Sequence, residues 1–471
     1  MNAKRVDYFV FAHFKLQKNN VRCLPRISYV AFVTQKKSTR SLHDGRVEKI
    51  VPGGLGLLRD DRGVFFVRGV LPGERVQLSG FSKKGGARFG HVQKIIETSK
   101  NRRQPDCDAH PKCGGCDFLD FNEIATEQAR HAMVSDALAR IGRLSQEELT
   151  RIKPLMRSSE TAMQRRRVQF HTSETGKIGY FARESHQLVE RHECHAIDPA
   201  LNELLSALAQ DDSLPKNGRF ACAVGNDNAC SVCLIHDDAV RARQFGEELV
   251  RKSMAVGVLL QNTDGEIFGR VGNPTIFGEV ACDAQGGPYQ SDAGTFTQAT
   301  RFGAREIVKQ TKRALEDCGY EGGPILELFA GAGHITFSLA EIASLVMAVE
   351  GAIHAVDHMR ANIDRSPFGE RIQCIWGDID GASFGEDYVD VLLDVPEALV
   401  LDPPRNGVIR IDKILEFLKP PILVMISCDL ATGARDLRLA LEAGYELVSV
   451  VPIDAFPRTS HTEWVAALKA R

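Results

Sequence analysis

The chain has 471 residues, which is enough for two to four domains with a substantial buried core. Its hydrophobic fraction of 43%, its charged fraction of 25% and its formal net charge of -2 are ordinary for a soluble globular protein. Any affinity for nucleic acid must therefore come from local basic patches, and no apolar run reaches the roughly 18 residues that a transmembrane helix requires.

The first 40 residues differ from the rest because they carry nine Lys or Arg residues against one acid, Asp7. The apolar patch Tyr8–Phe14 is interrupted by His13 and lacks a small-residue cleavage site, which argues against a signal peptide. We expect residues 1–42 to be a disordered basic extension or an over-extended start, with a nucleic-acid-binding tail as the alternative. Twelve cysteines without a secretion signal favour a cytoplasmic protein with reduced thiols, a metal site or a catalytic nucleophile.

Residues 43–98 are predicted to form a small closed β-barrel, because short runs of strand character alternate with Gly- and Pro-containing turns. Barrels of this size often bind single-stranded nucleic acid on one face. Lys83, Lys84 and Arg88 beside Phe89 would suit such a face, although a solvated basic hairpin explains the same residues.

Residues 99–285 are expected to form an α+β central domain, and its chemical motif is a set of four cysteines: Cys107, Cys113, Cys116 and Cys194. Four thiolates suit tetrahedral zinc or an iron–sulfur cluster. The spacing lacks the two Cys-x2-Cys knuckles of a common zinc ribbon, so we favour an iron–sulfur cluster over zinc. The pair Cys230 and Cys233 lies in an apolar stretch with no second pair, and we interpret it as strand core.

Three consecutive arginines, Arg165, Arg166 and Arg167, lead into a predicted strand. Alternation would place Arg165 and Arg167 on one face, where they could contact phosphate or the edge of a metal cluster. A solvated turn is the alternative.

Residues 286–471 show the strand–helix alternation of a Rossmann-like α/β domain. The apolar strand Ile325–Phe329 ends at a turn with Gly331 and Gly333, and helical spacing follows. The glycines let the backbone approach a ligand, and a helix N-terminus favours an anionic group. The next strand ends in Glu350, which could hydrogen-bond a ribose diol, and a further strand leads to Asp378 near the cofactor's base. A packing turn with a chance acid is the alternative.

Two later predicted strands are each followed by a candidate catalytic residue. One stops at Asp402, and the rigid Pro403-Pro404 turn leaves that acid at the carboxyl end of the strand. The other ends at Cys428, which is a candidate nucleophile there, with a structural thiol as the alternative. Glu463 precedes the closing strand.

A cysteine, a base and a polar group together match the needs of one reaction. Carbon 5 of uracil is a poor nucleophile toward a methyl donor, but addition of a thiolate at carbon 6 converts the ring into a reactive enolate. After methyl transfer, a base must remove the carbon 5 proton so that the thiolate can leave. Cys428, Glu463 and Asp402 supply this set.

The sequence resembles the RNA uracil-5 methyltransferase family, whose S-adenosylmethionine-dependent members make 5-methyluridine. It is similar in particular to the ribosomal-RNA branch with a TRAM domain and an iron–sulfur cluster, over about residues 43–471. Asp402–Arg405 matches the family's Asp-Pro-Pro-Arg segment, and Ser427–Thr432 matches Ser-Cys-(Asn/Asp)-x-Ala-Thr. Phe456–Glu463 matches the Phe-Pro-x-Thr-x-His-x-Glu ending.

The resemblance implies a multidomain chain with an OB-like TRAM barrel, an α+β iron–sulfur domain and a C-terminal class I methyltransferase domain. It implies that Cys428 is the nucleophile, that Glu463 is the base and that Asp402 engages the target uracil. The four cysteines would hold a [4Fe-4S] cluster. The implied S-adenosylmethionine positions are Gln298, Glu327 to Gly333 including Phe329 and Gly331, Glu350, Asp378 and Asp402.

Three departures from the family pattern bear on which RNA is modified. Thr300 stands where Asn is common, Ser460 stands where Gly is usual, and Gly351–His354 lacks the usual small-residue pattern.

We therefore expect a monomeric cytoplasmic enzyme that methylates a uridine in structured RNA, ribosomal RNA in preference to transfer RNA, without contacting a membrane. One alternative is a non-catalytic RNA-binding protein of the same fold, against which intact Cys428 and Glu463 argue. Another is an amino-group methyltransferase, which Arg405 in place of an aromatic residue disfavours.

Overall fold

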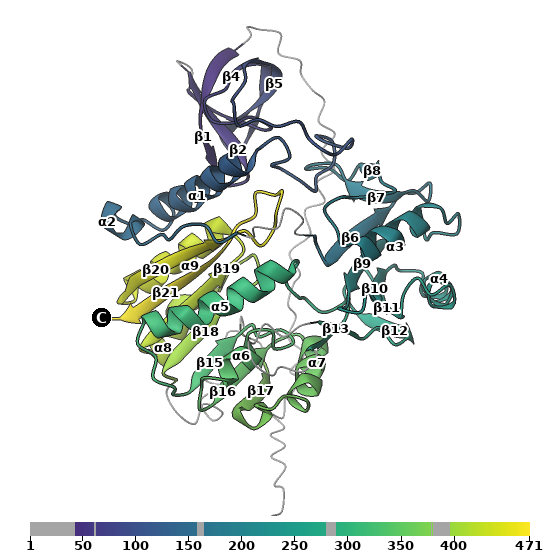
Figure 1. Cartoon of the computed structure of the whole chain (residues 1–471), viewed down its shortest axis with the longest axis vertical. Coiled ribbons are helices and arrows are strands. Elements are labelled where there is room, and N and C mark those ends of the chain that lie inside the picture. Colours follow the sequence, from purple (N-terminus) through teal and green to yellow (C-terminus); the bar gives the residue numbers. More distant parts are fainter. Residues whose placement is uncertain (1–42, 61–62, 158–163, 279–288, 378, 380–395) are drawn as a thin grey trace, which may run out of the picture. The chain divides into compact units, whose positions relative to one another are not determined.

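The computed structural model describes residues 43–60, 63–157, 164–278, 289–377, 379 and 396–471 (Figure 1). The predicted N-terminal extension and Asp378 lie outside these residues. The chain from Ser41 to Arg471 forms one compact unit. Among its described helices, none combines the length and the apolar character that crossing a membrane would require.

The N-terminal region is a closed five-stranded barrel, as predicted, with strand order β1-β2-β3-β5-β4. Its interior is apolar, and Leu58, Phe65 and Leu78 are fully buried. The strands are β1 (His43–Val51), β2 (Leu55–Asp60), β3 (Gly63–Val67), β4 (Arg75–Lys84) and β5 (Ala87–Glu97).

The predicted basic face lies on the β4–β5 hairpin of this barrel. Lys83 and Lys84 are exposed near its tip, and Lys83 pairs with Arg88 across the hairpin. The Arg88 guanidinium lies 5.6 Å from the centroid of the Phe65 ring and 5.7 Å from that of Phe81. These cation–π contacts fix one positive charge of the face on the barrel wall.

Helix α1 (Glu123–Arg140) links the barrel to the rest of the unit. Asn122 caps its first turn by accepting a hydrogen bond from the Ala125 amide, and the helix contacts β1 and α9 through a buried face that includes Met133 and Ala137. The short helix α2 (Gln146–Leu149) follows.

The central region contains a seven-stranded sheet of order β12-β11-β10-β9-β6-β7-β8, antiparallel except for the β10–β11 pair. Cys230 and Cys233 are buried in β10, which confirms that they are strand core. The elements are β6 (Arg167–Thr172), β7 (Ile178–Phe181), β8 (Leu188–Glu190), α3 (Pro199–Ala209), β9 (Arg219–Val224), β10 (Cys230–Ile235), α4 (Ala239–Arg251), β11 (Gly257–Gln261) and β12 (Ile267–Gly272).

The C-terminal region is built on a second seven-stranded sheet, of order β17-β16-β15-β18-β19-β21-β20. Five parallel strands form one side, and β21 joins β19 antiparallel. The strands are β15 (Ile325–Leu328), β16 (Val346–Glu350), β17 (Ile372–Trp376), β18 (Ala398–Leu401), β19 (Ile422–Ser427), β20 (Tyr445–Ile453) and β21 (Glu463–Ala470).

Strand order in this sheet reverses between β15 and β18, and parallel sheets bind ligands at such a switch point. The helix after the glycine turn is short, because only Thr336–Ala340 is helical in α6. The helices are α5 (Arg301–Asp317), α6, α7 (Ile353–Ile363), the 3-10 turn Gly369–Arg371, α8 (Ile411–Leu418) and α9 (Leu430–Glu442); a separate two-stranded sheet pairs β13 (Ile276–Gly278) with β14 (Tyr289–Ser291).

Candidate active site

The three predicted chemical residues lie at one edge of the C-terminal sheet. Asp402 directly follows β18, Cys428 directly follows β19, and Glu463 is the first residue of β21. The antiparallel register pairs Ser427 with Trp464, so the next position in the same register places Cys428 opposite Glu463. The fold therefore brings together a thiol and two carboxyl groups that are distant in sequence.

Burial controls the protonation of these groups. It raises the pKa of Cys428 to about 12, and the negative charges of Glu463 and Asp402 add to the effect while Arg405 opposes it. Burial raises the pKa of Glu463 to about 8, with Asp402 adding to the rise, and raises that of Asp402 to about 7. Cys428 and Glu463 therefore retain their protons near neutral pH while Asp402 titrates there, and a cationic ligand beside these groups would favour their ionised forms.

Helix α9 holds the turn that follows Asp402. The Thr432 hydroxyl donates to the Arg405 carbonyl at 2.9 Å, and the Val408 amide donates to Asp436 Oδ2 at 2.8 Å. Gly407 has a φ of 72°, and a Cβ there would lie 2.3 Å from Asp436 Oδ2. Only glycine fits this approach, so turn and helix behave as one support.

The first turn of α9 fixes the position of Cys428. The preceding Ser427 hydroxyl donates to the Asp429 carbonyl at 2.9 Å, and Asp429 caps α9 by accepting from the Ala431 and Thr432 amides at 3.0 Å. A Cβ at Gly433 would come within 2.5 Å of the Trp464 ring, so the helix packs directly on β19 and β21.

Arg130 on α1 organises the loop that leads to Glu463, a role that our sequence analysis missed. Its side chain is fully buried and donates to the carbonyls of Phe456 and Thr459, each at 2.9 Å, to that of His461, and to Thr462 Oγ1 at 3.0 Å. It also forms an ion pair with Asp454 at 2.8 Å. The available signal was an arginine within the apolar spacing of a predicted helix.

The same loop is hydrogen-bonded to the segment that carries the first three cysteines. Asp117, which follows Cys116, accepts from the Ser460 amide and hydroxyl at 2.8 Å each. The amides of Asp117 and Phe118 donate to the Arg458 carbonyl at 2.8 and 3.0 Å. Ser460, one of the departures from the family pattern, thus supplies a contact that glycine could not complete.

Cys113 interacts electrostatically with each of the other three predicted cysteines, and Cys116 also interacts with Cys194. Burial raises the pKa of Cys116 to about 11, and Cys194 and Cys113 add to the rise. Burial also raises the pKa of Cys113, and Cys194 and Cys107 add to it. Cysteines separated in the sequence therefore form one cluster that could hold a metal centre.

The two arginines predicted to share a face behave differently. Arg165 donates to the Gly115 carbonyl at 3.0 Å, next to Cys116, and its predicted contact with phosphate or a cluster edge stays a prediction. Arg167 is directed instead to the carbonyls of Asp292 and Ala293, at 3.1 and 2.8 Å. Strand β6 begins only at Arg167, so strand alternation does not extend back to Arg165.

The glycine turn after β15 leaves room for a ligand. Phe329, Gly331 and Gly333 have φ values of 65°, 58° and 96°, and a Cβ at Gly331 would meet no atom within 4 Å. The Gly331 amide donates to Glu350 Oε2 at 2.8 Å, and Ala352 donates to the other carboxylate oxygen at 2.7 Å. The predicted glycine turn and the predicted ribose-binding acid, Glu350, are therefore connected by a hydrogen bond.

Two of the residues that the resemblance assigns to S-adenosylmethionine have buried polar atoms without hydrogen-bond partners. Both carboxyl oxygens of Glu327 and the side-chain oxygen of Gln298 are in this condition. Burial raises the pKa of Glu327 to about 8, and the charges of Asp402 and Glu350 contribute. Because an unpaired buried polar atom is costly, these atoms suit a bound molecule that supplies donors.

Comparison with known proteins gives consistent relationships, although no family model matches the chain. The chain is 28% identical over 442 residues to the 23S rRNA (uracil(1939)-C(5))-methyltransferase RlmD of Halomonas elongata, which covers 90% of each protein. It is 29% identical over 451 residues to an uncharacterized RNA methyltransferase of Parasynechococcus marenigrum, covering 88% of this chain and 93% of that protein.

The fold is similar to that of the solved Pyrococcus abyssi tRNA (uracil-54, C5)-methyltransferase in complex with S-adenosyl-L-homocysteine. The TM-score is 0.65 at 18% identity, over 90% of this chain and 100% of that structure. In sequence this chain is a relative of proteins named RNA uracil-C5 methyltransferases, as its motifs predict, and it has the fold of the archaeal structure.

Proposed function

We propose that this protein transfers a methyl group from S-adenosylmethionine to carbon 5 of a uridine in RNA. The observation that carries the proposal is the meeting of Cys428, Glu463 and Asp402 at one sheet edge. The names of the relatives support uracil as the base, because several are uracil-C5 methyltransferases.

The reaction would begin with formation of the Cys428 thiolate. Asp402 and Glu463, the two carboxyl groups beside the thiol, are the candidates to accept its proton, and the family resemblance also assigns Asp402 to the target uracil. The thiolate would add to carbon 6 of uracil, and the electron pair of the ring double bond would move to form an enolate.

Carbon 5 of this enolate would then take the methyl group from the sulfonium, leaving S-adenosylhomocysteine. The Glu463 carboxylate would remove the carbon 5 proton, and the restored ring double bond would expel the thiolate. The positive sulfonium also favours the ionised forms of the neighbouring acids, which burial otherwise keeps protonated.

The glycine turn and the unpaired buried atoms suit S-adenosylmethionine. Glu350 would bind the ribose hydroxyls, and the open space at Gly331 allows close approach to the backbone. The side-chain oxygens of Glu327 and Gln298 would accept hydrogen bonds from the amino groups of S-adenosylmethionine. Phe329 belongs to the same turn, and Asp378 remains a proposed contact from the family resemblance.

The target uridine must leave its stack to reach Cys428. We favour ribosomal RNA because relatives of similar length are named for 23S rRNA, with transfer RNA as the second candidate because of the similar archaeal fold. The barrel hairpin with Lys83, Lys84 and Arg88 would contact the RNA backbone, in the manner of a TRAM domain.

A second RNA contact is a hollow of about 540 Å³ beside Gly114 and Gly115. In its lining, the His171 and Phe181 rings stack with centroids 3.8 Å apart. Burial lowers the pKa of His171 to about 4, with Arg219 and His186 contributing, so the imidazole is neutral near pH 7. A neutral aromatic pair of this kind offers a stacking surface for an unpaired base.

The four clustered cysteines would hold a [4Fe-4S] cluster. This proposal rests on the family resemblance and on the cysteine spacing, which lacks the two Cys-x2-Cys knuckles of a common zinc ribbon.

The test uses 5-fluorouridine-substituted ribosomal RNA, S-adenosylmethionine and the purified protein. Fluorine cannot leave as a proton does, so the proposed enzyme should be trapped as a covalent RNA adduct on a denaturing gel. The adduct should disappear in Cys428→Ala and persist in the control Cys318→Ala, whose thiol is buried at the end of α5. Mapping the adduct would identify the uridine.

A protein that is folded and binds S-adenosylmethionine, yet gives no adduct with ribosomal or transfer RNA, would contradict the proposal. That outcome would favour a non-catalytic RNA-binding protein of the same fold.

A further inference from the structure

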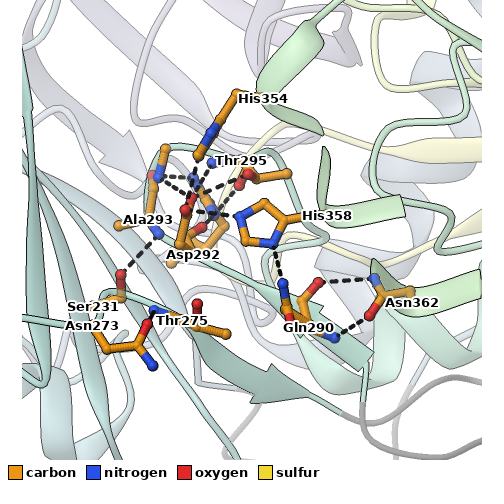
Figure 2. Close-up of polar contacts among 12 residues, drawn as sticks. Ser231, Asn273, Thr275, Gln290, Asp292, Ala293, Thr295, His354, His358 and Asn362 are labelled. Atoms are coloured by element: carbon orange, nitrogen blue, oxygen red, sulfur yellow. Dashed lines mark hydrogen bonds and ion pairs between the residues drawn. The ribbon is translucent and has the colours of Figure 1, made fainter. Parts of the chain in front are cut away.

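Three potential metal ligands, Asp292, His354 and His358, gather at one point (Figure 2). Asp292 follows β14, and His354 and His358 lie one turn apart on α7. One ligand atom from each residue lies within 4.8 Å of the other two, and Asp292 and His358 are buried. The mechanism proposed above uses none of the three.

The three side chains are already directed at one point. His354 Nε2 and His358 Nε2 each lie 2.8 Å from the same carboxylate oxygen, Asp292 Oδ2. Their spacing of four residues puts both imidazoles on one face of α7. A metal with ligand distances of about 2.0–2.1 Å would hold such atoms about 3.3 Å apart, so the ligands need to open by only about 0.5 Å.

Hydrogen bonds to Oδ1 hold the Asp292 carboxylate in place. Asp292 Oδ1 accepts from the Gly294 amide at 2.9 Å, from the Thr295 amide at 3.0 Å and from the Thr295 hydroxyl at 3.1 Å. This leaves Oδ2 for the histidines, as Figure 2 shows. Outer hydrogen bonds of this type orient the ligating oxygen in metal sites.

The buried carboxylate of Asp292 has an imidazole pair on one side and a guanidinium nearby. The side chain is 2% exposed, and Arg167, which donates to the backbone carbonyls of Asp292 and Ala293, also attracts the Asp292 carboxylate electrostatically. Arg167 therefore favours the ionised form of the carboxylate, which is the form that ligates a metal. A divalent ion between the three ligands would bind Oδ2 in place of the two imidazole hydrogen bonds.

One neighbouring side chain must turn for metal binding. His358 Nδ1 lies 3.2 Å from the side-chain nitrogen of Gln290, whereas a metal-bound imidazole donates its second N–H to an acceptor. Rotation of the Gln290 amide would present its oxygen instead. Arg365, which now donates to that oxygen at 2.7 Å, would keep its hydrogen bond to Asn362 Oδ1 at 3.1 Å.

We propose that Asp292, His354 and His358 bind a divalent transition-metal ion of the zinc type, with water completing the coordination. Two imidazoles and one carboxylate are a ligand set that Zn²⁺ favours, and the 17% exposure of the His354 side chain gives the ion and the water a route in. The bound ion would tie the segment leading to Gln298 to the helix that follows Glu350.

The experiment uses full-length protein purified anaerobically with its cysteine site occupied, so that added metal does not bind free thiols. Competition between the protein and a chromophoric chelator measures Zn²⁺ affinity and stoichiometry. We expect one Zn²⁺ per chain, and we expect His358→Ala to weaken binding by more than the about 10–100-fold that loss of an outer-shell partner costs. His192→Ala removes an exposed histidine and should leave the affinity unchanged.

Two further measurements keep the test independent of folding defects. Bound Co²⁺ should give ligand-field bands without a thiolate charge-transfer band, which separates this site from the cysteines. Gln290→Glu offers a permanent acceptor to His358 Nδ1 and should tighten Zn²⁺ binding. A thiolate band, a Zn²⁺ affinity weaker than micromolar, or the same stoichiometry and affinity in His358→Ala would overturn the proposal and leave the three residues as a hydrogen-bonded contact.

Discussion

The two sides of the candidate active site are positioned in different ways. Asp402 and Cys428 lie directly at the ends of the buried parallel strands β18 and β19, and α9 supports both positions. Glu463 is reached through a loop whose shape depends on Arg130 and Asp117, more than 300 residues earlier in the chain. Asp402 and Cys428 are thus positioned by elements of the C-terminal sheet region alone. Glu463 also depends on residues from the N-terminal half of the unit.

The largest expected effect tests the base itself. Glu463→Gln removes the group that takes the carbon 5 proton, and loss of a general base typically slows a reaction by about 10²–10⁴-fold. Since addition and methyl transfer remain possible, a covalent complex with ordinary RNA should accumulate on a denaturing gel with labelled S-adenosylmethionine. Normal turnover by this variant would show that another group removes the proton.

The next largest effect is expected from replacing Arg130, the buried arginine of α1 that holds the loop before Glu463. Arg130→Met leaves Asp454 and several loop carbonyls without their donor, and removal of one partner of a buried ion pair costs about 3–5 kcal/mol. Chemical denaturation measures this loss. The control Arg140→Met, on the same helix with a 61% exposed side chain, should change stability by less than about 0.5 kcal/mol. Equal losses in both variants would argue against the role given to Arg130.

The cysteine cluster should affect the loop through Asp117. Cys194→Ala is expected to lower the iron content and the melting temperature, and to reduce methyl transfer although no chemical residue is changed. Iron analysis, thermal melting and methyl transfer on the same preparation check this expectation. Unchanged iron content and melting would remove Cys194 from the ligand set.

The pH dependence of stability tests the raised pKa of Glu463. The folded protein holds the Glu463 proton to about pH 8, whereas the ordinary value is 4.5, so folded protein binds more protons than unfolded protein between these values. Stability attributable to this group therefore falls as pH rises from about 4.5 to about 8. Glu463→Gln should match the parent near pH 4 and exceed it in stability at pH 8. A constant difference across this range would contradict the burial argument.

The smallest effect is expected at Ser460. Ser460→Gly restores the residue usual in the family and removes the hydroxyl bond to Asp117 but keeps the amide bond. A loss of about 0.5–1.5 kcal/mol with active protein is expected from denaturation and methyl-transfer assays. A complete loss of methyl transfer would mean that the hydroxyl has a chemical role.

The sequence was sufficient for features that a local pattern specifies. Buried parallel strands appear as apolar runs, so the positions of Asp402 and Cys428 after them could be predicted, as could the link between the Gly331 turn and Glu350. The closed barrel followed from its alternation and turns.

Long-range contacts leave no such pattern. The contact of Arg130 with the 456–462 loop depends on how α1 packs in the folded protein. The spacing of apolar residues within α1 predicts only that one face of the helix is buried. The different destinations of Arg165 and Arg167 depend on where β6 begins. The convergence of Asp292 with α7 arises from two segments that are separate in sequence.

The contact between Arg130 and the final loop also constrains the order of assembly. The ribosome makes α1 long before residues 454–463, so the helix is available as a template when this last loop emerges. A fragment that begins at residue 286 would retain every strand of the C-terminal sheet yet lack the cation that shapes the approach to Glu463. The loop that leads to Glu463 therefore keeps its observed hydrogen bonds only in a chain that also carries α1.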